Sequence, residues 1–318
     1  MTKAQKTIYD ILISDLREWS IEELVLRTWL DRTVVHRHLQ SLIKSGYIEK
    51  SGYGKYRGVI WAVEYLEKPF FERKAVEYNP DFLSLYIPNV SSFLWERLSR
   101  LEEATKDIRE FSTFDYMKNR RGIENFLTDL SYASSKLEGN TYSHLDTEVL
   151  IKYRESAEGK TKEETTMILN HKDALEYIIA SRSWFNLIKK DFCEIHTLLA
   201  KWLIHDTYLG IFRTTPVQIG SSRYVPISIS SLLESEFSLF LEKLRAIKNP
   251  FEQSLFILVF IPYFQAFIDI NKRTSRLSAN IPLISQWLPP ISLMQIKEKM
   301  YINAILAVYE LNDVSLMA

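Results

Sequence analysis

The sequence is short of cysteine, glycine and proline, and each shortage excludes something. Among 318 residues there is one cysteine, Cys193, and a single thiol can form neither an internal disulfide nor a multi-cysteine metal site. We therefore expect a reducing compartment and predict a cytoplasmic protein. With nine glycines and ten prolines, few residues interrupt the helical spacing of the apolar side chains, so the chain is predicted to be mainly α.

Long apolar runs and an excess of charge are missing as well. The most apolar run, residues 255–261, is too short to cross a bilayer, and residues 1–10 are polar, so we expect no membrane span and no signal peptide. The 40 Lys and Arg residues balance the 40 Asp and Glu residues. A neutral chain has no overall attraction to nucleic acid, so any DNA binding has to come from a local patch.

What is present divides the chain into three regions. Residues 1–68 have their own periodicity and turns, which predicts a small separate domain. Residues 69–90 contain three prolines among aromatic residues, which predicts an irregular connector. From residue 91 to residue 318 the pattern is helix after helix, interrupted by a strand-like segment at 211–229 that favours a β-hairpin around residues 220–222.

The first region predicts three helices followed by a glycine-tipped hairpin. Ser20 and Glu23 have the spacing of a capping box at the start of the second helix. The predicted elements are helices at 7–16, at about 21–28 and from about residue 31 to Gly46, then hairpin strands at 47–50 and 59–63. This order of elements resembles the winged helix-turn-helix of bacterial transcription regulators.

As a DNA-binding module, this domain would place its third helix in the major groove and its wing on the backbone. The side chains that would reach DNA are Arg32, Arg37, Gln40, Lys55 and Arg57. Residues 1–68 carry 11 Lys and Arg against 9 Asp and Glu, a small surplus that predicts weak binding to phosphates. The alternative is a winged helix that serves protein contacts or dimerisation.

The segment after the apolar helix at 255–267 has the composition of an anion site. A helix that starts after a loop offers free backbone N–H groups and the positive end of its dipole. Asn271, Arg273 and Arg276 add hydrogen-bond donors and charge, and Asp269 is a hard oxygen ligand suited to Mg²⁺. The alternative is a buried helix corner with a cluster of surface ion pairs.

The same segment, QAFIDINKRTSRLSANIPL, resembles the signature of the Fic (filamentation induced by cAMP) family, HxFx(D/E)GNGRxxR. The residues that match the signature are Phe267, Asp269, Asn271, Arg273 and Arg276. The resemblance implies a helical Fic fold over about residues 91–310 and transfer of AMP from ATP to a protein hydroxyl, with Mg²⁺ as cofactor. It implies that Asp269 holds the metal, that Asn271 and Arg273 hold the α- and β-phosphates, and that Arg276 reaches the γ-phosphate.

Two further segments resemble parts of this family. LGIFRTTPVQIGSSRYVP is similar to the flap, a hairpin that aligns a target segment by strand addition. The flap residues would be Ile219, Gly220, Ser221, Ser222 and Tyr224. SSKLEGN resembles the inhibitory-helix motif (S/T)xxxE(G/N), with Ser134 and Glu138 in its key positions, which places an inhibitory helix near 125–140. Glu138 would then pair with Arg276, whereas the alternative is an ordinary helix end with Gly139 at its C-cap.

The signature also departs from the family pattern. Gln265 stands where the family has its catalytic histidine, and an amide cannot take a proton near neutral pH. Losing a general base typically costs about 10²–10⁴-fold in rate. Ile270 and Lys272 replace the two glycines, and a branched residue such as Ile adopts positive φ only at a cost. Lys272 could offer phosphates a charge in place of the lost backbone contact.

The sequence is compatible with three functions. The first is a Fic-family protein related to protein adenylyltransferases, with transfer impaired or altered at Gln265. The second is a nucleotide-responsive regulator whose winged helix binds DNA and whose Fic domain is inactive. The third is an interaction module. A homodimer is compatible with each, and the sequence identifies no target protein.

Overall fold

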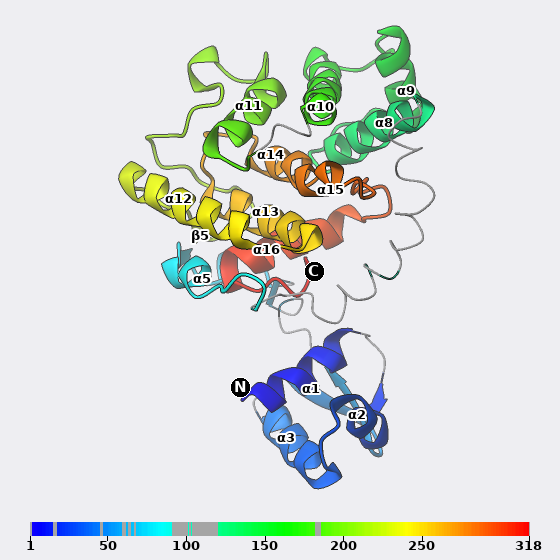
Figure 1. Cartoon of the computed structure of the whole chain (residues 1–318), viewed down its shortest axis with the longest axis vertical. Helices are drawn as coiled ribbons and strands as arrows, with labels where there is room; N and C mark the ends of the chain where they lie inside the picture. Colours follow the sequence, from blue (N-terminus) through cyan, green and yellow to red (C-terminus); the bar gives the residue numbers. More distant parts are fainter. Residues whose placement is uncertain are drawn as a thin grey trace. The chain divides into compact units, whose positions relative to one another are not determined.

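The computed structural model describes residues 2–14, 18–44, 47–58, 62, 65–66, 68–90, 101, 103, 120–181 and 186–317. Contacts among these residues divide the chain into two compact units, Met1–Arg73 and Lys74–Ala318. The chain is mainly helical, which confirms the predicted fold class at that level (Figure 1). In the ranges just given, every helix is too short or too polar to cross a bilayer.

In its described residues, the first unit contains the helices α1, α2 and α3 and an antiparallel sheet with the strand order β1-β3-β2. Its elements are α1 (Lys3–Ser14), β1 (Trp19–Ser20), α2 (Ile21–Thr28), α3 (Arg32–Lys44), β2 (Ile48–Gly52), β3 (Lys55–Gly58) and the 3₁₀ turn η1 (Phe70–Glu72). The predicted capping box is confirmed: the Ser20 N–H donates to the Glu23 carboxylate at 2.8 Å, and the Glu23 N–H donates to Ser20 Oγ at 3.2 Å.

One apolar face from each helix forms the core of this unit. The buried side chains include Ile8, Leu24 and Leu39. The hairpin turns at Gly54, whose φ of 67° is a conformation that glycine adopts without strain. The return strand is β3, which ends before the strand predicted at 59–63. That prediction is wrong at Ala62, which is helical, whereas residues 59–61 and 63, like Gly46, lie outside the described residues.

The second unit is built around α13, a helix that is apolar on all sides. Its elements are β4 (Val76–Glu77), α5 (Pro80–Ser84), α8 (Arg120–Lys136), α9 (His144–Tyr153), α10 (Lys162–Ala180), α11 (Lys189–Ala200), η2 (Asp206–Tyr208), β5 (Tyr224–Val225), α12 (Ser230–Ala246), α13 (Pro250–Phe264), α14 (Asn271–Ser278), α15 (Ile281–Ser285) and α16 (Glu298–Leu311). Helices α12, α14, α15 and α16 all contact α13, so it is buried on every face (Figure 1).

The segment predicted as a connector, 69–90, carries short elements, and from Lys74 onward it belongs to the second unit. Aromatic side chains attach it to α13: the Phe82 ring lies 5.0 Å from that of Phe260, and the Tyr86 ring lies 4.7 Å from that of Phe256. The prolines that suggested irregularity therefore shape a segment that packs on the central helix.

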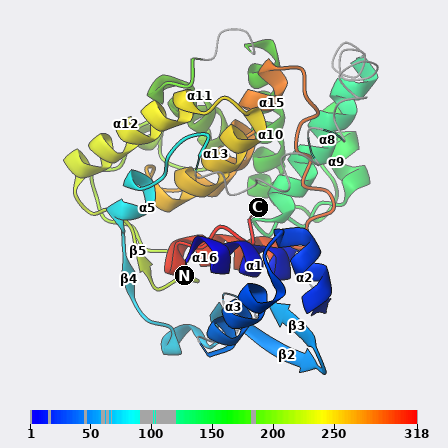
Figure 2. The same ribbon diagram turned by 60° about the horizontal axis from the view of Figure 1, so that its bottom comes forward.

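The β-hairpin predicted for the flap is wrong. Within 211–229, all of which the structure describes, the only strand is β5, and its partner is the distant β4, which runs parallel to it (Figure 2). A tight turn does form, because the Ser222 N–H donates to the Ile219 carbonyl at 3.1 Å. Pro216 and Pro226 lie on either side of that turn, and a proline cannot donate to a strand ladder.

Candidate active site

The loop between α13 and α14 begins and ends with a residue in the left-handed backbone conformation. Gln265 ends α13 with φ 48°, and Ile270 precedes α14 with φ 64°. For a branched residue the left-handed region costs about 1–2 kcal/mol. The buried Arg213 stabilises the start of the loop: its backbone N–H donates to the Ala266 carbonyl at 2.9 Å, and its Nε donates to the Gln265 carbonyl at 2.5 Å.

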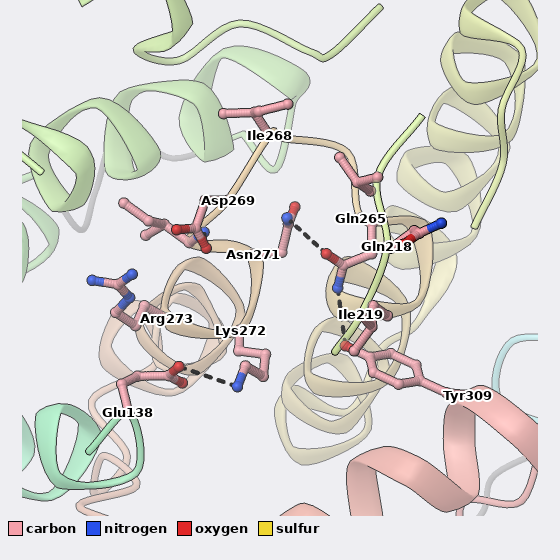
Figure 3. Close-up of a pocket in the computed structure, with 12 residues that line it drawn as sticks. Glu138, Gln218, Ile219, Gln265, Ile268, Asp269, Asn271, Lys272, Arg273 and Tyr309 are labelled. Atoms are coloured by element: carbon pink, nitrogen blue, oxygen red, sulfur yellow. Dashed lines mark hydrogen bonds and ion pairs between the residues drawn. The ribbon is translucent and has the colours of Figure 1, made fainter. Parts of the chain in front are cut away.

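Asn271 and Gln265 form one hydrogen-bond network inside this loop (Figure 3). Asn271 Oδ1 accepts from the Phe267 N–H at 2.9 Å, and its Nδ2 donates to the Phe267 carbonyl at 2.9 Å and to Gln265 Oε1 at 3.1 Å. Gln265 Nε2 in turn donates to the Pro262 carbonyl at 2.8 Å and to the Tyr309 hydroxyl at 3.0 Å. Both amides therefore hold the loop, and neither can accept a proton.

The loop borders a cavity of about 290 Å³. Its lining residues are Glu138, Val217, Gln218, Ile219, Gln265, Ile268, Asp269, Ile270, Asn271, Lys272, Arg273 and Tyr309. The cavity thus contains the start of α14, where the first N–H groups of a helix have no intrahelical acceptor. Of the side chains predicted to bind phosphate or metal, the structure brings Asp269, Asn271, Lys272 and Arg273 to this cavity.

Arg273 is a buried cation whose donors are not all used. It is 8% exposed, and its Nε and Nη1 have no hydrogen-bond partner. Burial lowers the pKa of its guanidinium, although the carboxylates of Glu138 and Asp269 act in the opposite direction. A buried charged donor without a partner is costly, so this side chain is prepared for an anion.

Asp269 offers an exposed carboxylate at the edge of the same cavity. No group of three or more His, Cys, Asp or Glu residues in the described parts of the chain could hold a metal by itself. One carboxylate fits a Mg²⁺ ion that enters together with phosphates, since Mg²⁺ in such sites keeps several waters and few protein ligands.

Arg276, the remaining predicted phosphate ligand, does not line the cavity. Its side chain is 1% exposed and lies behind Glu138, whose Oε1 is 2.8 Å from its Nη1. Glu138 Oε2 is 3.1 Å from Lys272 Nζ (Figure 3). Burial raises the pKa of Glu138, but the charges of Arg276, Lys272 and Arg273 outweigh burial and lower the pKa overall.

The end of α8 determines where Glu138 lies. The Asn140 N–H donates to the Ser135 carbonyl and the Gly139 N–H donates to the Lys136 carbonyl, which is the pattern of a Schellman motif. Gly139 has φ 84°, a conformation that other residues rarely adopt. Gly139 is therefore the C-cap that the sequence allowed as an alternative, and the same turn directs Glu138 toward Arg276.

Ser134 links this pair to a buried histidine. Arg276 Nε donates to Ser134 Oγ at 2.9 Å, and Ser134 Oγ lies 3.0 Å from His171 Nε2. His171 Nδ1 is 2.7 Å from the Met167 carbonyl, so Nδ1 carries the proton and Nε2 accepts from Ser134. Burial lowers the pKa of His171 to about 3, which keeps the ring neutral.

His196 is a buried residue of α11 with contacts of its own. Its ring stacks on Phe267 at 3.9 Å, and its Nδ1 accepts from the Gly210 N–H at 3.0 Å. Burial lowers the pKa of His196 to about 4. Neither His171 nor His196 lines the cavity, so neither replaces the missing histidine of the signature.

The predicted flap residues divide into a tip and an anchor. Gly220 and Ser221 are exposed, and Ile219 lines the cavity. Ser222 and Tyr224 are buried: Ser222 Oγ donates to the Glu310 carboxylate at 2.7 Å, and the Tyr224 hydroxyl donates to the Tyr263 carbonyl at 2.7 Å. Those two side chains attach the segment to the rest of the second unit and are not exposed for contact with a target protein.

Sequence reasoning missed several residues at this site, among them Tyr309 and Arg213, which hold the loop. Tyr309, which binds Gln265, had no signal beyond the helical spacing of α16. Arg213 lies in the flap-like segment, and an arginine among apolar residues was the one available clue.

Two of the side chains predicted to contact DNA in the first unit form ion pairs with glutamates. Arg32 Nη2 lies 3.0 Å from the Glu22 carboxylate, and Lys55 Nζ lies 3.1 Å from that of Glu18. The remaining residues of that set are Arg37 and Gln40, both exposed on α3, and Arg57, whose side chain lies outside the described residues.

Comparison with known proteins finds relatives of the part of the chain that holds most of this site. Residues 184–283 match the model of the Fic/DOC family. Protein adenylyltransferase Fic of Aedes aegypti is 27% identical over 205 residues, which cover 63% of this chain and 40% of that protein. The chain thus aligns with less than half the length of this curated relative.

Two solved structures share the fold. A Fic family protein from Desulfovibrio desulfuricans G20 has a TM-score of 0.59 at 16% identity and covers 73% of this chain and 71% of its own. A Fic domain containing signaling protein from Bacteroides thetaiotaomicron VPI-5482 has a TM-score of 0.52 at 18% identity and covers 65% of this chain and 78% of its own. Residues 184–283 therefore match the Fic/DOC family, and the second unit shares its fold with these two structures.

Proposed function

We propose that the second unit binds ATP with Mg²⁺ and is related in function to protein adenylyltransferases, with transfer impaired because Gln265 replaces the catalytic histidine. The proposal rests on the state of Arg273, which lines a cavity of about 290 Å³. This residue is only 8% exposed, and its Nε and Nη1 have no hydrogen-bond partner. The name of the Aedes aegypti relative, protein adenylyltransferase Fic, supports the same class of reaction.

In that reaction the oxygen of a protein hydroxyl attacks the α-phosphorus of ATP. The bond from the α-phosphorus to the bridging oxygen breaks, pyrophosphate leaves, and the hydroxyl proton needs an acceptor. Arg273 and the first N–H groups of α14 would hold the phosphates, and Asp269 would hold Mg²⁺, which neutralises phosphate charge. Gln265 has no basic nitrogen, so the proton has no acceptor at the position that the family uses.

We further propose that Glu138 inhibits nucleotide binding. Its carboxylate lines the cavity and carries a negative charge close to the phosphate-binding residues. A phosphate at that position would be repelled, because like charges a few ångströms apart in a poorly solvated site interact strongly. Ser134 would act indirectly, by holding Arg276 in place.

Calorimetry with Mg–ATP tests the binding, and intact mass measurement after incubation with Mg–ATP tests the transfer. We expect Glu138→Gln to bind more tightly than the wild type and Arg273→Gln to bind less tightly. Arg245→Gln, which removes an exposed arginine on α12, is the matched control and should bind like the wild type. If neither the wild type nor Glu138→Gln binds ATP at millimolar concentration, the proposal is refuted.

A second candidate function belongs to the first unit. The exposed Arg37 and Gln40 on α3 support weak binding of duplex DNA by a winged helix-turn-helix, which would make the chain a nucleotide-responsive regulator. Electrophoretic retention of DNA by the full chain, with and without ATP, tests this candidate. Retention that the substitution Arg37→Ala leaves unchanged would contradict it.

A further inference from the structure

Glu138 binds two cations of very different character. Arg276 is buried at 1% exposure, whereas the Lys272 side chain is 40% exposed and lines the cavity. The family signature has glycine where this chain has Lys272, so the second cation is a feature of this chain. Which of the two cations a bound phosphate takes from Glu138 determines how the site responds to a nucleotide.

Arg276 is held in place without any help from Glu138. Its Nε donates to Ser134 Oγ at 2.9 Å, its Nη2 to the Ser134 carbonyl at 3.0 Å, and its Nη1 to the Tyr301 hydroxyl at 3.0 Å. The guanidinium also lies 5.2 Å from the centre of the Tyr301 ring. If Glu138 lost its charge, Arg276 would keep these contacts and stay out of the cavity.

Lys272 is free to move by comparison. Its amine has one ion-pair partner among the described residues, the Glu138 carboxylate, and it sits in the first turn of α14 next to Arg273. A half-exposed ion pair is weak, because water and salt screen it. The Arg276–Glu138 pair is much harder to separate, because moving Glu138 away would leave the charge of the buried Arg276 uncompensated in the interior.

We propose that Lys272, and not Arg276, is the cation that the second or third phosphate of a bound nucleotide takes from Glu138. Arg273 would receive the first phosphate, and Arg276 would remain a fixed anchor for the end of α8. The site would then select nucleoside diphosphates and triphosphates over monophosphates. This inference rests on the nucleotide binding proposed above, and it gives Arg276 a different role from the one that the family resemblance implies.

Calorimetry of the full chain with AMP, ADP and ATP, each with Mg²⁺, tests the inference. We expect Lys272→Ala to weaken ADP and ATP binding about tenfold, as for the loss of one charge-assisted hydrogen bond, and to change AMP binding less than twofold. Lys272→Arg should retain the preference for ADP over AMP. Lys152→Ala is the matched control, because Lys152 also pairs with a glutamate, at 2.5 Å, but lies on α9 away from the cavity.

A double variant separates the two cations. We expect Glu138→Gln to strengthen ADP binding about tenfold, and Lys272→Ala in the same chain to remove that gain. A gain that persists without Lys272 would assign the phosphate to Arg276 and overturn the inference. ADP binding by the wild type that Lys272→Ala leaves unchanged would overturn the inference alone, whereas no nucleotide binding by any variant would overturn the proposed function as well.

Discussion

At the scale of single residues, if the second unit transfers AMP as proposed, the residue at position 265 decides whether the target hydroxyl has a proton acceptor. We expect Gln265→His, made together with Glu138→Gln, to raise AMP transfer by about 10²–10⁴-fold, the usual contribution of a general base. Histidine is among the residues that tolerate the left-handed φ of 48° found here. Intact mass measurement with Mg–ATP is the assay.

Gln265→Asn provides the control, since it keeps an amide and adds no base. If the histidine variant binds ATP but transfers no more AMP than the asparagine variant, the missing base is not what limits the reaction.

Glu138 also makes the stability of the domain depend on pH. The pKa of Glu138 is lowered in the folded chain, because the charges of Arg276, Lys272 and Arg273 outweigh burial. The ionised carboxylate therefore stabilises the folded chain above the unfolded pKa of about 4.3. This stabilisation is lost as the pH falls through the lower pKa of the folded chain. We expect Glu138→Gln to cost about 2 kcal/mol of unfolding free energy at pH 7. Denaturant titrations should show that this difference is constant from pH 8 to about pH 5.5 and narrows below pH 4.3. A difference that narrows between pH 8 and 6 would disprove the assignment.

The side chains at the site were only partly predictable from the sequence. Asp269, Arg273 and the pairing of Glu138 with Arg276 followed from spacing within the motifs and from the family resemblance. The contact between Lys272 and Glu138 did not, because it joins residues far apart in the chain and replaces a family glycine. Ile270 was expected to resist positive φ, yet it adopts 64°, and burial of its side chain to 2% exposure offsets part of the strain.

At the scale of elements, the C-terminal end of α8 couples backbone conformation to the site. Gly139→Ala forces a Cβ into φ 84°, so we expect it to cost about 1 kcal/mol and to loosen Glu138 from Arg276, which strengthens ATP binding. Gly159→Ala is a matched control: its φ is 74°, nothing lies within 4 Å of the added Cβ, and it lies in the turn before α10.

Thermal unfolding and calorimetry distinguish the two variants. Both should lose similar stability, but only Gly139→Ala should change the affinity for ATP. Equal affinities in the two variants would mean that the turn at Gly139 caps the helix and does not control the position of Glu138.

Elements with strong local signals were predictable, and those that depend on distant partners were not. The bounds of α2 agree with the prediction because the Ser20–Glu23 capping box is a local interaction. The flap hairpin failed because prolines remove donors on both sides of its turn, and because the available strand edge pairs with β4, about 150 residues earlier in the chain. Sequence spacing contains no information about such a partner.

At the scale of the whole molecule, the chain consists of two units with separate cores, and its zero net charge hides how its cations are used. In the first unit, acids neutralise Arg32 and Lys55. These pairs leave the surplus of two positive charges in residues 1–68 unchanged, but they occupy two of the five side chains predicted to contact DNA.

If the first unit binds DNA, the Arg32–Glu22 pair should limit its affinity. We expect Glu22→Gln to release Arg32 and tighten binding to duplex DNA about two- to fivefold at low salt, and to steepen the dependence of log K on log salt by about one unit, as for one added phosphate contact. The control is Glu148→Gln, which releases Lys152 in the second unit and should change neither quantity. Fluorescence anisotropy across a salt series measures both. Equal effects of the two substitutions would show that DNA responds only to net charge, and that α3 does not enter the groove.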